Sequence, residues 1–180
     1  MEQRVELLEV QLQDSREGTA NAKSAEHFAQ RAREFFGKQD FHRAIANCNI
    51  AIELDQQHPQ AYFRRGQAYW NLHAPPELVA IDHSEAIRLK PDYADAYFCR
   101  SSQWERAADL QRAREDAQQA VNLVPTDHDY LSHLGVLCIN LGDYPAAMQH
   151  LSSAIEHCQT AAALDHKAYR AIAAAHARDF

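Results

Sequence analysis

Histidines and cysteines are the residues of this chain most able to do chemistry, since the sequence contains 11 histidines and 4 cysteines. His150 and His157 lie seven positions apart, and Cys158 follows directly. Two histidines that share one zinc ion on a helix are usually four positions apart, so this pair is spaced too widely for one ion. We therefore expect solvated or partly buried histidines, no metal site and no cofactor.

No group of residues matches a known catalytic pattern. The sequence has no glycine-rich phosphate loop, no nucleophile elbow and no HExxH motif. The adjacent carboxylates Glu115 and Asp116 are expected on a solvated helix surface. Cys99 and His133 could form a thiol–imidazole pair, but a thiolate nucleophile also needs an orienting group and an oxyanion site, which the sequence does not indicate. We expect a protein that is not an enzyme.

The elements that position these residues repeat along the chain. Four alanines stand 35, 34 and 34 positions apart: Ala51, Ala86, Ala120 and Ala154. Four larger anchors stand 34, 35 and 34 positions apart: Phe28, Tyr62, Tyr97 and Leu131. A period in this range is typical of stacked helical units, each of which needs a neighbour to bury its apolar face.

Small residues and helix caps support the same division. A small residue follows each anchor by four positions, at Ala32, Gly66, Ser101 and Gly135, where two helix backbones can approach closely. Asp40, Asp109 and Asp143 precede helical patterns and can cap them. A further helix is expected to begin near Pro76, because proline is tolerated in the first turn.

The repeated units resemble the tetratricopeptide repeat, a helix-turn-helix of 34 residues. The fourth unit shows the pattern at Leu131, Leu134, Gly135, Cys138, Ala147, Leu151 and Ala154. The resemblance implies an all-α, right-handed α-solenoid in one elongated domain. We expect an N-terminal helix in 1–23, four repeats in 24–161 (about 25–58, 59–93, 94–127 and 128–161), and a capping helix or the first helix of a fifth repeat in 162–180.

The family resemblance also implies a concave groove lined by the first helix of each unit. The residues that would form a peptide-binding groove are Arg33, Phe36, Phe63, Arg64, Gln67, Trp70, Asn71, Phe98, Ser102, Arg106, His133, Val136 and Asn140. Other inward positions include Cys99, Glu105, Ser132 and Ile139. Phe, Trp and Arg are enriched at binding hot spots, although the aromatic residues could instead pack against neighbouring helices. The recurrent Arg31, Arg65 and Arg100 are expected to pack between helices.

The family's best-known device is a carboxylate clamp that grips the acidic tail of heat-shock chaperones. Its positions fall here on Ala29, Arg33, Arg64, Asp95 and Cys99, and none carries the family's residue. We therefore expect an adaptor that binds a peptide segment or helix of a protein partner by other contacts. The expected ligand is an acidic amphipathic segment.

Two other functions remain open. In the first, Val5, Leu8 and Leu12 of the N-terminal helix pair with a second copy, and the protein is a dimeric assembly or secretion chaperone. The same helix could instead cap the first unit or occupy the groove. In the second, the chain is the regulatory repeat module of a larger enzyme or signalling protein.

Charge and hydropathy exclude several classes of partner. The formal net charge is −7, which argues against a nucleic-acid binder. No apolar run approaches the ~20 residues that span a bilayer, so we expect no membrane insertion and a cytoplasmic protein. Cys48 and Cys138 fall on packing positions and are expected to be buried thiols. Because full protonation of the histidines would raise the charge to +4, we expect solubility and partner binding to change near pH 6.

Overall fold

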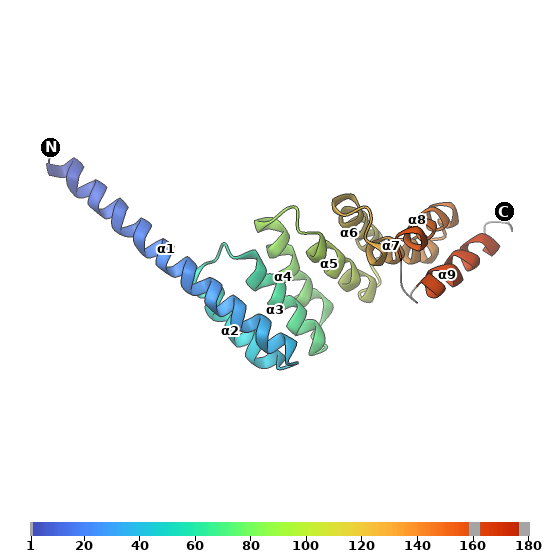
Figure 1. Cartoon of the computed structure of the whole chain (residues 1–180), viewed down its shortest axis with the longest axis horizontal. Helices are drawn as coiled ribbons and strands as arrows, with labels where there is room; N and C mark the ends of the chain where they lie inside the picture. The colour runs from blue at the N-terminus through green and yellow to red at the C-terminus, as the bar shows by residue number, and fades with distance from the viewer. Residues whose placement is uncertain (1, 159–162, 177–180) are drawn as a thin grey trace. The chain divides into compact units, whose positions relative to one another are not determined.

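The computed structural model describes residues 2–158 and 163–176, and every regular element in those ranges is an α-helix. The helices are α1 (Glu2–Gly37), α2 (Phe41–Leu54), α3 (Pro59–Asn71), α4 (Pro76–Leu89), α5 (Ala94–Arg106), α6 (Leu110–Leu123), α7 (His128–Asn140), α8 (Tyr144–His157) and α9 (Ala163–His176). Figure 1 shows them in order along the chain. The predicted all-α class is confirmed.

The helices begin where the sequence predicts. The side chain of Asp40 accepts a hydrogen bond from the backbone N–H of Arg43 at 3.1 Å. Asp109 and Asp143 cap α6 and α8 in the same way. α4 begins at Pro76, as expected. Each cap satisfies one of the backbone donors that the first turn of a helix leaves unpaired.

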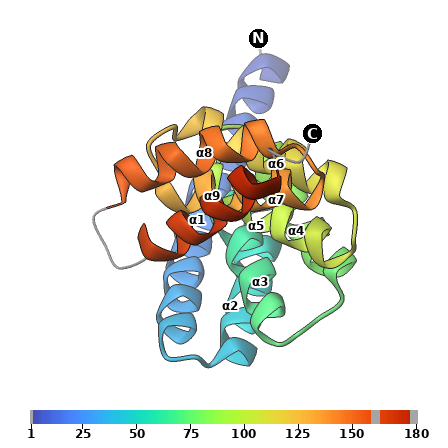
Figure 2. The ribbon, with the colours of Figure 1, turned by 90° about the vertical axis from the view of Figure 1, so that its right-hand side faces the viewer.

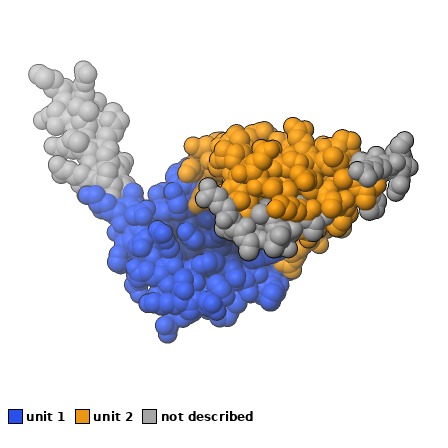
Figure 3. All heavy atoms as spheres, turned by 45° about the vertical axis from the view of Figure 1, so that its right-hand side comes forward, with its two compact units in different colours: residues 1–75 blue, residues 76–180 orange. Residues whose placement is uncertain are grey.

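The chain divides into two compact units, residues 1–75 and 76–180, where the sequence predicted one elongated domain (Figure 3). The division falls between Pro75 and Pro76, at the start of the helix expected near Pro76. In unit 1, α1 packs against α2 and α2 against α3. In unit 2, each helix from α4 to α9 packs against the next, and Figure 2 shows α8 and α9 side by side. The predicted repeat boundaries stay predictions.

The repeated small residues form the core of both units. Each of the recurrent alanines Ala51, Ala86, Ala120 and Ala154 is fully buried. Val79 on α4 is also fully buried. The buried thiols predicted at Cys48 and Cys138 are confirmed. Two helices pack closely here because short side chains lie at their crossing points.

Gly135 tests this packing directly. A β-carbon added there would lie 2.6 Å from Cγ of Leu151, which is fully buried. We expect Gly135→Ala to lower the free energy of unfolding by about 1 kcal/mol, because the overlap outweighs the gain in helix propensity. Urea unfolding followed by circular dichroism would measure it. Gly37→Ala is the control, since nothing lies within 4 Å of the added methyl group; equal effects at both glycines would contradict the packing argument.

The N-terminal segment is part of the first helix of the array. α1 is continuous from Glu2 to Gly37, so the predicted boundary at residue 23 has no break in the backbone. Groove occupancy by this segment would require a bend that α1 does not have. Ala20 to Ser24 are exposed. At the other end, α9 packs against α8 and buries Ala173. Within the helices that the structure describes, none has the length and apolar character needed to cross a membrane.

Candidate binding faces

Arg64 is the centre of the predicted face in unit 1. Its guanidinium carbon lies 5.9 Å from the ring centroid of Phe36 on α1 and 5.8 Å from that of Phe63 on α3. Its Nη1 donates a hydrogen bond to Oε1 of Gln67 at 3.0 Å. No carboxylate in the part of the chain that the structure describes forms an ion pair with Arg64. Two aromatic rings and one amide therefore surround the Arg64 guanidinium.

A hollow of about 480 Å³ opens beside Phe36, one of the two rings that contact Arg64. It is lined by Phe36, Gly37, Gln39, Phe41 and Asn71. The rings of Phe36 and Phe41 meet edge to face with centroids 5.4 Å apart. Phe36 and Asn71 belong to the predicted groove, whereas the sequence analysis missed Phe41. The sequence did contain a signal for Phe41, because it is an aromatic residue directly after the helix cap Asp40. It was missed because it begins the second helix of its repeat, and only first helices were expected to line the groove.

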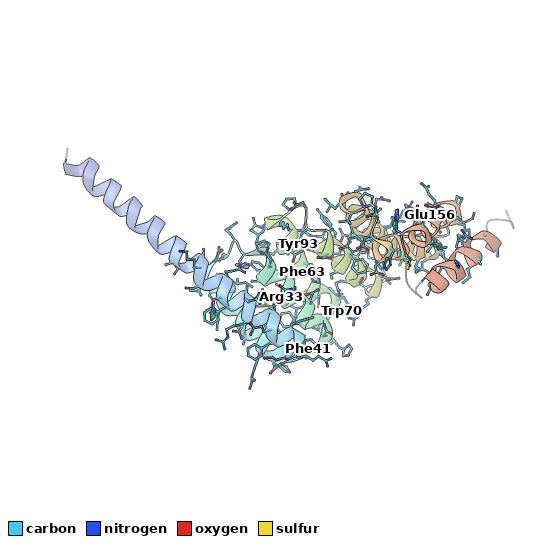
Figure 4. The ribbon with its side chains drawn as sticks, viewed as in Figure 1. Arg33, Phe41, Phe63, Trp70, Tyr93 and Glu156 are labelled. Carbon is cyan, nitrogen blue, oxygen red and sulfur yellow. The ribbon has the colours of Figure 1, made fainter. Side chains whose placement is uncertain are left out.

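The other predicted residues of unit 1 differ in their access to a ligand. Arg33 and Asn71 are exposed, and Trp70 is half-buried on α3. Phe63 is only 3% exposed, so its ring is part of the helix packing and not an anchor for a ligand. This corrects its assignment to the groove. Figure 4 labels Arg33, Phe63 and Trp70 on their helices.

In unit 2 the corresponding face is built around Phe98. Its ring lies 5.1 Å from that of Tyr130 and 5.2 Å from that of His133, both on α7. The Tyr130 hydroxyl donates a hydrogen bond to Oδ1 of Asp95 on α5. Burial raises the pKa of Tyr130, and its bond to Asp95 raises it further. Phe98 therefore packs mainly against α7. Much of its ring takes part in helix packing, which was the alternative to a ligand contact.

His133 is held by Ser101. The Ser101 hydroxyl donates to the backbone oxygen of Ala113 at 2.7 Å, and Oγ lies 2.8 Å from Nε2 of His133. Since the only hydroxyl hydrogen goes to Ala113, Nε2–H of His133 must be the donor to Ser101, which leaves a lone pair on Nδ1. Burial lowers the pKa of His133 to about 4, so the ring is neutral at pH 7.

Glu105 lies on the outer side of this ring. Its Oε2 is 3.9 Å from Nδ1 of His133, and its Oε1 accepts from Nδ2 of Asn140 at 3.4 Å. Burial raises the pKa of Glu105. Serine, histidine and glutamate also form hydrolase triads, but Ser101 is completely buried and its proton is committed to Ala113. This arrangement does not expose a nucleophile.

The remaining predicted residues of unit 2 lie along the same two helices. Ser102 on α5 donates to the backbone oxygen of Phe98, while Arg106 is exposed at the end of that helix. Val136 is half-buried and Asn140 is exposed on α7.

Two of the three recurrent arginines, Arg65 and Arg100, pack between helices as predicted, whereas Arg31 is exposed and lies over the ring of Phe28 on its own helix. Arg65 donates to Oδ1 of Asn49 at 2.8 Å. Arg100 forms two 2.7 Å hydrogen bonds with the Asp116 carboxylate. The expectation that Asp116 lies on a solvated surface is wrong, because Asp116 is buried and also accepts from Nε1 of Trp104. Glu115, its neighbour, is exposed.

The histidines do not behave as one set. Burial lowers the pKa of His83 to about 4, with a further contribution from Arg100, and burial also lowers the pKa of His150. His83 and His133 therefore take up protons well below the pH near 6 that the sequence predicted, and the pKa of His150 is shifted in the same direction. No cluster of three metal-binding side chains is found among the residues that the structure describes.

These features define an all-α protein built of repeated helix pairs. The tetratricopeptide repeat family model matches residues 30–77 and 105–166, more than half of the chain. The chain therefore belongs to the tetratricopeptide repeat family, whose domains act as protein-interaction modules.

Known relatives agree with this assignment. Protein STIP1 homolog of Dictyostelium discoideum is 26% identical over 137 residues, which is 74% of this chain and 24% of that protein. The chain thus spans about a quarter of the length of this curated relative.

Solved structures show the same fold. YrrB, described as having an unusual peptide-binding site, has a TM-score of 0.74 at 19% identity over 88% of this chain and 84% of its own. MamA from Desulfovibrio magneticus RS-1 has a TM-score of 0.66 at 22% identity, covering 74% and 75%. The first repeat domain of Spaghetti (RPAP3), bound to the HSP90 peptide SRMEEVD, has a TM-score of 0.65 at 20% identity, covering 67% and 95%. At these identities the likeness shows the fold alone.

Proposed function

We propose that this chain is a non-catalytic adaptor that binds a peptide segment or helix of a protein partner on the first helices of its repeats. The observation that carries the proposal is the Arg64 site with the adjoining hollow in unit 1. Arg64 has no carboxylate partner among the described residues, and it lies beside an open aromatic hollow. This combination suits a ligand that has an acidic residue next to an apolar one.

Two comparisons support this choice of ligand. The structure of Spaghetti (RPAP3) contains an acidic peptide, and that of YrrB is described as having an unusual peptide-binding site. The residues of the chaperone clamp do not occur at the matching positions here. The acidic segment would therefore be held by Arg64 and Arg33 in a geometry specific to this chain, with Phe36, Phe41 and Trp70 contacting its apolar side chains.

The affinity should be moderate. Burying one aromatic or leucine side chain contributes roughly 1.5–3 kcal/mol, and association itself costs several kcal/mol. Two or three anchors with one charge pair correspond to a Kd in the micromolar range. Affinity in that range fits an exchangeable adaptor better than a permanent complex.

A displayed library of random 12-residue peptides, selected on the purified chain, tests the proposal without a known partner. We expect selected peptides to carry Asp or Glu beside Leu or an aromatic residue. Phe36→Ala and Arg64→Gln should each weaken their binding at least about tenfold by fluorescence polarisation, since both remove a central contact.

Arg43→Gln is the matched control, because Arg43 is an exposed arginine on the second helix α2 of the same unit. It should leave binding unchanged. If Arg43→Gln abolished binding while Phe36→Ala and Arg64→Gln did not, the ligand would lie on the second helices, and the proposed face would be wrong.

Two further properties are part of the proposal. We infer a cytoplasmic location from the buried thiols and the composition of the chain. We also infer that pairing through α1 is possible for a dimeric chaperone, and light scattering would distinguish such a dimer from a monomeric adaptor.

A further inference from the structure

The face of unit 2 carries two hydrogen-bond acceptors that lie close together, with a gap of 3.9 Å between them. Nδ1 of His133 bears a lone pair, because Nε2–H is donated to Ser101. Oε2 of Glu105 lies 3.9 Å from that nitrogen, beyond hydrogen-bonding distance. The two groups come from neighbouring helices, α5 and α7. A donor from outside the chain could bond to both.

No cation lies in this gap among the residues that the structure describes. Within them, no lysine or arginine forms an ion pair with Glu105, whose side chain is near His133 and accepts a hydrogen bond from Asn140. The side chain of Glu105 is 34% exposed and that of His133 is 13% exposed, so a ligand can reach both. Burial raises the pKa of Glu105, as expected of a carboxylate that lacks a compensating positive charge.

We propose that Glu105 and Nδ1 of His133 form a subsite for a lysine or arginine side chain of the bound peptide. The ammonium or guanidinium N–H groups would donate to the carboxylate and to the imidazole lone pair at once. The aliphatic part of the side chain would lie beside the ring of Phe98, which is 5.2 Å from His133. Charge-assisted hydrogen bonds of this kind are stronger than neutral ones.

This inference rests on the proposed function and makes it more specific. The Arg64 site in unit 1 favours an acidic residue in the ligand, whereas the Glu105 site in unit 2 favours a basic one. Taken by itself, each unit therefore prefers a ligand residue of a different sign. An acidic residue bound at the face of unit 2 would leave Glu105 facing a like charge.

A blocked lysine, N-acetyl-lysine N-methylamide, tests the subsite without any peptide. We expect saturable shifts of the His133 ring signals in NMR spectra of the full chain, assigned by their loss in His133→Gln. The blocked norleucine analogue should give no saturable shift, because it has the same stem without the ammonium group. Glu105→Gln should weaken the lysine probe roughly tenfold.

Glu156→Gln is the matched control, since Glu156 is an exposed carboxylate on α8 of the same unit (Figure 4). It should leave lysine binding unchanged. The subsite is overturned if lysine gives no saturable shift, if norleucine binds equally well, or if Glu105→Gln has no effect. These outcomes are separate from the peptide selection: selected peptides that depend on Arg64 would uphold the adaptor function even if the lysine probe failed.

Discussion

Asp116→Ala should lower the free energy of unfolding of unit 2 by about 3 kcal/mol, more than any other single substitution considered for this chain. The change removes the carboxylate that accepts from Nε and Nη2 of Arg100 and from Nε1 of Trp104. Arg100 would remain as a charge whose side chain is only 20% exposed. The expected loss lies at the low end of values for buried pairs because part of the guanidinium can reach water, and Arg100 keeps a bond to Ser84.

Urea unfolding of the whole chain, followed by circular dichroism, measures this loss. Glu85→Ala is the control: Glu85 and Arg88 form an equally short ion pair, but one on the surface of α4. That substitution should cost less than 1 kcal/mol, because solvent screens exposed pairs. Similar losses in both variants would show that the Arg100–Asp116 pair is no better shielded than a surface pair. Replacing both partners with apolar residues should cost less than removing Asp116 alone.

The sequence predicted the helices well because their signals are local. Asp40, Asp109 and Asp143 act on backbone groups three residues away, so a cap can be recognised from a short stretch of chain. The buried alanines were recognised because their period is regular. The division into two units was not predicted, since it depends on how many contacts each helix makes with distant ones. Pro75 and Pro76 showed where one helix begins, but not that the chain divides into two units there.

The candidate site was harder to predict for a related reason. The sequence placed Phe36, Arg64 and His133 on the first helices, but it could not show which of their neighbours cover them. Phe63 proved to be buried, although its residue type and position are those of a ligand contact. Asp116 proved to be a structural partner of Arg100, because the two residues are 16 positions apart and lie on different helices.

Glu105 is a residue whose proposed role could not be predicted from the sequence. As an isolated residue it is one of many acidic side chains on helices. Its importance depends on the tautomer of His133, which depends in turn on the bond that Ser101 makes with Ala113. Three residues from two helices and one backbone oxygen must be placed before the gap between the two acceptors becomes visible.

Lowering the pH from 7 to 5 should lower the free energy of unfolding by about 4 kcal/mol through two histidines. Burial lowers the pKa of both His83 and His133 from the usual 6.5 to about 4. Between those values the unfolded chain binds protons that the folded chain does not, so stability falls as the pH drops through this range. At pH 5, each histidine lowers the free energy of unfolding by about 2 kcal/mol. The raised pKa of Glu105 acts in the opposite direction and reduces the sum.

Unfolding in urea at pH 7 and at pH 5 measures this dependence. His83→Leu and His133→Gln should each reduce the difference between the two pH values by about 2 kcal/mol, whatever their stability at pH 7, because neither replacement can take up a proton. His157→Gln should leave the difference unchanged, since His157 is exposed on α8. If both buried-site variants kept the full difference, the acid sensitivity would arise from other groups, and the neutral state of His133 on which the lysine subsite depends would need a different explanation.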